Sequence, residues 1–83
     1  MEPRANLLPG LHPIASVTMA DQVEERIRAY LTQQGFKPGD ALPKEVEMAE
    51  ALGVSRNVVR EALSRLRMLG MIETKKRRGM VLT

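Results

Sequence analysis

The chain of 83 residues contains no cysteine and no tryptophan, and it has only one tyrosine, one phenylalanine and one histidine. Without cysteine, neither a disulfide scaffold nor a thiolate metal site can form. No segment is long and apolar enough to span a membrane, and no signal peptide is visible. These absences predict a cytoplasmic protein with an aliphatic core in which methionine fills gaps.

Groups that carry catalysis are also scarce. The only histidine, His12, lies in an N-terminal segment interrupted by Pro3, Pro9 and Pro13. No nucleophile–base pair, metal-ligand cluster or phosphate-binding glycine loop is visible. We therefore predict no catalytic residue, no metal site, no cofactor and no enzymatic activity. We expect residues 1–17 to form a flexible arm and residues 18–83 to form one small domain.

The charge is unevenly divided along the chain. Residues 1–53 contain five basic and eight acidic side chains, whereas residues 54–83 contain eight basic and two acidic ones, giving net charges of −3 and +6. A separate basic half is what the phosphate backbone of a nucleic acid attracts. Many basic helices bind nothing, so this asymmetry supports a motif but cannot replace one.

The most informative stretch is a predicted helix at 56–69. Ser55 is a favourable N-cap, and Gly53 and Gly70 provide stop signals on either side. One face of this helix is apolar and another is rich in arginine. The apolar face contains Val59, Ala62, Leu63, Leu66 and Leu69, and the basic face contains Arg56, Arg60 and Arg67.

A shorter predicted helix precedes it, with Val46, Ala49 and Leu52 on its inner side. Two helices joined by a short turn that contains glycine form a helix-turn-helix, which we place at about 45–64. In that motif the N-terminal residues of the second helix meet base edges in the DNA major groove. Arg56, Asn57 and Arg60 occupy those positions, and we also expect Ser55 among the DNA-binding residues. Arginine can contact guanine and asparagine can contact adenine.

The remaining elements predict a mainly α member of the α+β class. Thr18 to Asp21 resembles a capping box, and the helix that follows is expected to bury Val23, Ile27, Tyr30 and Leu31. Residues 71–82 alternate like a two-stranded hairpin with a basic tip, which is typical of a wing. The wing residues expected at the DNA are Lys75, Lys76, Arg77, Arg78 and Gly79.

The motifs together resemble the N-terminal winged helix-turn-helix of GntR-type bacterial transcriptional regulators. The resemblance covers about residues 18–83, and its most specific run is Ser-Arg-x-x-Val-Arg-Glu-Ala-Leu at 55–63. It also includes these matches: Leu42-Pro43, Val54, Leu66, Gly70 and Arg78-Gly79. It implies three helices and a two-stranded wing, with helix 56–69 in the major groove and wing residues 75–79 at the minor groove.

The chain departs from the family pattern at three positions. Lys44 stands where the family usually has a capping serine, so about 1 kcal/mol of capping energy is missing. Val46 stands where the family often has an arginine that reaches DNA, and we assign a phosphate contact to Lys44 in its place. Arg77 stands where the family commonly has glycine, which leaves the geometry of the turn open.

We therefore predict a sequence-specific DNA-binding domain that binds a palindromic operator. The alternative is a winged helix that binds protein and makes no base contacts. By resemblance, a second domain that binds an effector and dimerises is missing after Thr83. The isolated chain is then expected to be monomeric or weakly dimeric, and the full-length protein a homodimer.

Overall fold

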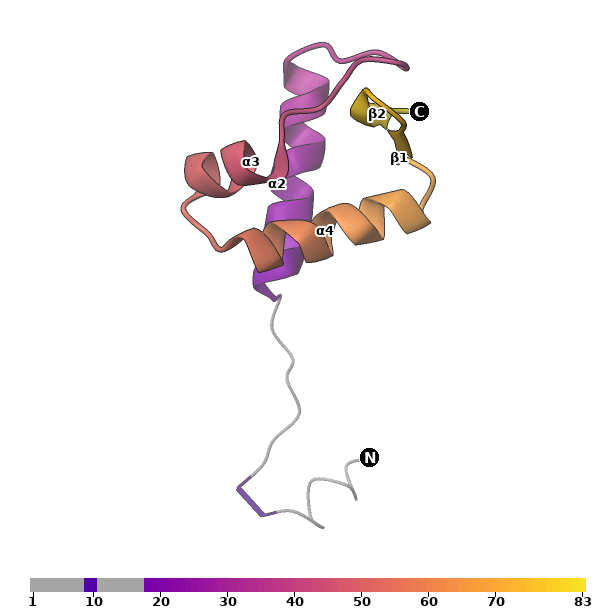
Figure 1. Cartoon of the computed structure of the whole chain (residues 1–83). Helices are drawn as coiled ribbons and strands as arrows, with labels where there is room; N and C mark the ends of the chain where they lie inside the picture. The colour runs from indigo at the N-terminus through magenta and orange to yellow at the C-terminus, as the bar shows by residue number, and fades with distance from the viewer. Residues whose placement is uncertain (1–8, 11–17) are drawn as a thin grey trace.

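A computed structural model of the chain describes residues 9–10 and 18–83 (Figure 1). The expected flexible arm at 1–17 therefore lies almost entirely outside the described residues, and the domain boundary at residue 18 stays a prediction. The described elements are α2 (Met19–Gln33), α3 (Glu45–Leu52), α4 (Arg56–Met68), β1 (Ile72–Lys75) and β2 (Gly79–Leu82). This order confirms the predicted winged helix-turn-helix architecture.

Helix α2 begins at the predicted capping box. The Asp21 N–H donates to the Thr18 hydroxyl and the Thr18 N–H donates to the Asp21 carboxylate, each over 3.1 Å. Val23, Ile27 and Leu31 are buried as expected. Tyr30 is not: its side chain is exposed, because it lines an open hollow between α2 and α3.

Helix α3 buries Met48 and Ala49, but the prediction that Val46 faces the core is wrong. Five of the eight α3 residues are apolar, so the sequence allowed more than one rotation of the helix about its axis. In the structure, Met48 and Ala49 form the buried face of α3, and the first turn of the helix extends beyond the core. Val46 therefore faces solvent at the N-terminal end of α3.

Helix α4 crosses α2 and provides the centre of the core (Figure 1). Its predicted apolar stripe is confirmed at Val59, Ala62, Leu63 and Leu66, which are almost completely buried. Leu69 was expected in the same stripe but is exposed. Helix α4 ends at Met68, and Gly70, with a φ of 77°, turns the chain toward β1 before Leu69 can pack.

The wing is an antiparallel hairpin in which Ile72 pairs with Leu82 and Lys75 pairs with Gly79. Ala41, in the segment before α3, forms an isolated antiparallel bridge to Val81 of this hairpin. Leu42 donates a backbone hydrogen bond of 2.8 Å to Met80 and buries its side chain in the core. These contacts anchor the wing to the helical part of the domain.

Candidate nucleic-acid interface

The turn between α3 and α4 determines where α4 begins. Gly53 ends α3 with a left-handed φ of 69°. Glycine adopts this conformation at the lowest cost because it has no Cβ. Two residues later the Ser55 hydroxyl accepts a 3.2 Å hydrogen bond from the Val58 N–H. The Ser55 side chain thus caps α4, and its contact with DNA stays a prediction.

The first two turns of α4 present arginine to solvent. The side chains of Arg56 and Arg60 are 61% and 58% exposed, and Asn57 between them is also exposed. The buried stripe around Val59 and Leu63 lies beside these residues on the helix. Burial of this apolar side fixes the rotation of α4, so the predicted base-reading residues must point outward together.

Glu45, the first residue of α3, lies against these arginines. Its Oε1 and Oε2 accept hydrogen bonds from Nη2 and Nε of Arg60 over 3.0 and 3.2 Å. Nη2 of Arg56 lies 3.6 Å from the same Oε1. Glu45 was not predicted as a partner of these arginines, although an acidic residue at the start of the first helix of the helix-turn-helix was a usable signal.

The electrostatic state of this cluster follows from its contacts. The hydrogen bond from Arg60 is the main cause that lowers the pKa of Glu45, with smaller contributions from the charges of Arg60 and Arg56, while burial acts in the opposite direction. In turn, Glu45 raises the pKa of Arg60. Both groups are therefore ionised at neutral pH, and the cluster carries one negative and two positive charges.

Lys44 lies at the N-cap position of α3, with its side chain exposed. Its ammonium group cannot accept a hydrogen bond from the helix, as expected. The Glu47 carboxylate instead accepts a 2.9 Å hydrogen bond from the Lys44 backbone N–H. This half of a capping box keeps the start of α3 ordered and leaves the Lys44 side chain outside the cap.

The wing residues form a second basic group at the C-terminal end of α4 (Figure 1). Lys75, Lys76, Arg77, Arg78 and Gly79 are all exposed. Nη2 of Arg78 donates a 2.9 Å hydrogen bond to the backbone carbonyl of Gly39, and Lys75 pairs with Glu73 over 3.4 Å. Arg77 has a φ of 74°, the conformation that glycine provides in the family pattern.

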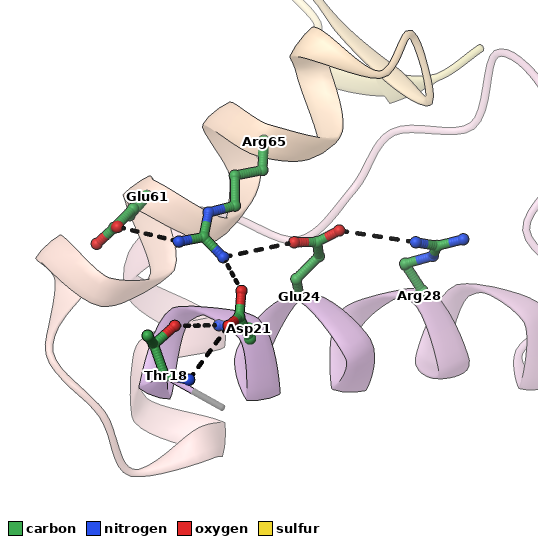
Figure 2. Close-up of polar contacts among 6 residues, drawn as sticks. All are labelled: Thr18, Asp21, Glu24, Arg28, Glu61 and Arg65. Carbon is green, nitrogen blue, oxygen red and sulfur yellow. Dashed lines mark hydrogen bonds and ion pairs between the residues drawn. The ribbon is translucent and has the colours of Figure 1, made fainter. Parts of the chain in front are cut away.

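Arg65 belongs to a different surface of α4. Its guanidinium contacts Asp21 of α2, Glu61 of α4 at 3.3 Å and Glu24 of α2 at 3.8 Å (Figure 2). It therefore lies on a different side of α4 from Arg56 and Arg60. Because its contacts join two helices, Arg65 is not a neutral surface residue where stability matters.

Two further observations limit the chemistry of the domain. Within residues 9–10 and 18–83, no three histidine, aspartate or glutamate side chains are grouped so that they could hold a metal ion. No helix in the described part of the chain is long and apolar enough to cross a membrane.

Comparison with known proteins identifies relatives of the whole domain. Residues 19–82 match the family described as "Bacterial regulatory proteins, gntR family". YcbG of Bacillus subtilis (strain 168), an uncharacterized HTH-type transcriptional regulator, is 50% identical over 62 residues, which are 75% of this chain and 27% of YcbG. Mce2R of Mycobacterium tuberculosis (strain CDC 1551 / Oshkosh), an HTH-type transcriptional regulator, is 42% identical over 66 residues, 80% of this chain and 28% of Mce2R. The chain thus spans about a quarter of the length of these curated relatives.

Solved structures agree with this assignment. The DNA-binding domain of AraR in complex with operator ORR3 has a TM-score of 0.72 at 26% identity, covering 88% of this chain and 92% of that one. Streptococcus agalactiae GntR has a TM-score of 0.71 at 28% identity, and the match covers 77% of this chain and 31% of that one. These matches decide between the two functions that the sequence left open, in favour of DNA binding. The chain belongs to the gntR family of bacterial regulatory proteins, as a winged helix-turn-helix DNA-binding domain and not an enzyme.

Proposed function

We propose that α4 enters the major groove of an operator and that Arg56, Asn57 and Arg60 contact its base edges. The observation that carries this proposal is their joint exposure on the N-terminal turns of α4, beside the buried stripe. Arginine in this position can donate two hydrogen bonds to guanine O6 and N7, and asparagine can bond to adenine. The AraR domain, whose fold this chain shares, was solved on its operator, which supports the same orientation here.

The wing and the start of α3 supply the remaining contacts. We assign Arg78 and Gly79 at the hairpin to the minor groove, and phosphate contacts to Lys44, Lys75, Lys76 and Arg77. The exposure of all these residues supports this assignment. Phosphate contacts position a protein on DNA, whereas contacts to base edges provide the sequence information.

We expect a full-length regulator that carries this domain to act as a cytoplasmic dimer. Its relatives are transcriptional regulators of which this chain covers about a quarter. A dimerising second domain would place two copies of α4 on two half-sites of a palindromic operator. Alone, the domain would bind one half-site weakly, as a monomer or weak dimer.

Selection of bound duplexes from a random DNA pool, followed by titration, tests the proposal. About four or five phosphate contacts predict that log K falls with log salt with a slope of about −4. Each base pair of the selected site is then substituted in turn. Arg60→Ala should lose about 1–3 kcal/mol of discrimination at one base pair and little at the others.

Arg28→Ala is the control variant because it removes the same charge from α2, on the Arg65 side of the domain (Figure 2). It should leave discrimination at every base pair unchanged. Binding without salt dependence would contradict the phosphate contacts. Equal effects of Arg28→Ala and Arg60→Ala would contradict the assignment of α4 to base readout.

A further inference from the structure

Glu45 occupies one particular edge of the Arg60 guanidinium. The two carboxylate oxygens bond Nη2 and Nε over 3.0 and 3.2 Å, which is the two-point geometry typical of arginine–carboxylate pairs. Only 24% of the Glu45 side chain is exposed, so the carboxylate is partly enclosed. The pair therefore fixes the orientation of the guanidinium plane as well as the position of its charge.

The hydrogen bonds of Arg60 can be counted. A guanidinium has five N–H groups. Glu45 takes one from Nε and one from Nη2, and the Asn57 side-chain oxygen takes one from Nη1 over 3.3 Å. One N–H remains on each terminal nitrogen, and such a pair matches the O6 and N7 acceptors of guanine.

We propose that Glu45 is a positioning residue for base recognition: it holds Arg60 by its Nε/Nη2 edge so that the two free terminal N–H groups face a guanine. This inference rests on the proposed placement of α4 in the major groove. Its second consequence concerns charge. A carboxylate beside the DNA repels phosphates, so Glu45 lowers affinity for unrelated DNA while it raises preference for the operator.

The two consequences separate positioning from simple charge. Glu45→Gln keeps the size of the side chain but removes its charge and replaces one acceptor with a donor, which Arg60 cannot bond. We expect this variant to bind the selected duplex about tenfold more weakly and to lose most of its preference at the base pair that Arg60 reads. Binding to an unrelated duplex should stay equal or become tighter.

Glu50→Gln is the matched control because Glu50 is exposed on the same helix and has no ion pair among the described residues. It removes the same charge, so both duplexes should bind equally well or slightly more tightly, with the base preference intact. Far-UV circular dichroism and thermal melts establish that all variants are folded. Equilibrium titrations of the 83-residue chain at one fixed salt concentration measure each dissociation constant.

A double variant tests whether Glu45 acts through Arg60. Once Arg60→Ala has removed the reading group, Glu45→Gln should cause no further loss of base preference. An equal loss in both backgrounds would overturn the inference. So would a Glu45→Gln variant that tightens operator and unrelated DNA by the same factor, because Glu45 would then be only a repelling charge.

The failure of the proposed function is recognised separately. A parent chain without base preference, or an Arg60→Ala variant that keeps the parent preference, overturns the reading of DNA by α4 and this inference with it. A parent that reads through Arg60 and is indifferent to Glu45→Gln overturns the inference alone.

Discussion

The guanidinium of Arg65 on α4 contacts the carboxylate of Asp21 in the first turn of α2 (Figure 2). The same carboxylate accepts the Thr18 N–H over 3.1 Å, so the cap of α2 and the back of α4 are joined. Glu61 and Glu24 also contact Arg65, at 3.3 and 3.8 Å. Together they form a small network on the side of α4 that faces away from Arg56 and Arg60.

Loss of Arg65 should therefore reduce stability without changing base preference. Arg65→Ala leaves three carboxylates near one another without their shared cation, and a network of this kind contributes more than an isolated surface pair. We expect the melting temperature to fall by a few degrees. Arg67→Ala, which removes an exposed arginine that has no acidic partner in the described part of the chain, should melt close to the parent. Identical melting of the Arg65→Ala variant and the parent would contradict the prediction.

Acid should weaken the same junction. Hydrogen bonds from the backbone and hydroxyl of Thr18 are the main causes that lower the pKa of Asp21; Arg65 lowers it further and burial opposes them. Because the pKa is lower in the folded state, ionised Asp21 stabilises the fold above the ordinary aspartate pKa. That stabilisation is lost as pH falls below about 4 and through the folded pKa.

The variant Asp21→Asn tests this pH dependence because it cannot ionise. Melting temperatures measured between pH 7 and pH 3 should show a deficit relative to the parent that shrinks as the pH falls. Glu25→Gln removes an exposed carboxylate from the same helix and controls for the loss of a negative charge. A deficit of Asp21→Asn that stays constant over the whole range would refute the linkage.

The turn of the wing should be improved by glycine at position 77. Arg77 has a φ of 74°, and an L-residue in the left-handed region costs about 1–2 kcal/mol. Glycine at this position removes that cost, but part of the gain in stability is offset because glycine loses more backbone entropy on folding. We expect Arg77→Gly to raise the free energy of unfolding in urea by about 0.5–1 kcal/mol. Lys76→Gly loses the same charge without relieving a positive φ, and it should not be stabilised.

The wing should also contribute to recognition through Arg78. In the free protein its guanidinium bonds the Gly39 carbonyl, an exposed contact that DNA can replace. A narrow minor groove has a strong negative potential that attracts arginine, so Arg78→Ala should weaken binding most where the operator is flanked by A·T pairs. Arg77→Ala should cost less, and equally on all flanks, as a phosphate contact would.

Two duplexes that differ only in the A·T content of their flanks provide the measurement. The parent should prefer the A·T-rich one by several-fold, and Arg78→Ala should remove most of that preference. An equal loss on both duplexes would mean that Arg78 contacts only the backbone. The minor-groove assignment would then be withdrawn, while the major-groove assignment would stand.

The sequence predicted the elements and their ends well because those depend on neighbours in the chain. The Thr18–Asp21 capping box, the Ser55 cap and the left-handed Gly53 all involve residues within a few positions of one another. Burial was predicted less well at Tyr30, Val46 and Leu69. Helical spacing places a residue on a face, but the neighbouring element decides how far along the helix that face is covered.

By itself, then, the sequence determined the three helices, the hairpin, the apolar stripe of α4 and the outward direction of Arg56, Asn57 and Arg60. Only the tertiary structure decided which acidic groups contact Arg56, Arg60 and Arg65. Glu45 precedes Arg60 by 15 residues, and Asp21 precedes Arg65 by 44. Such pairs depend on how α2, α3 and α4 cross, which is determined by the close packing of their buried side chains. A long guanidinium side chain can reach carboxylates in several directions, and the packed core decides which carboxylates lie within hydrogen-bond distance.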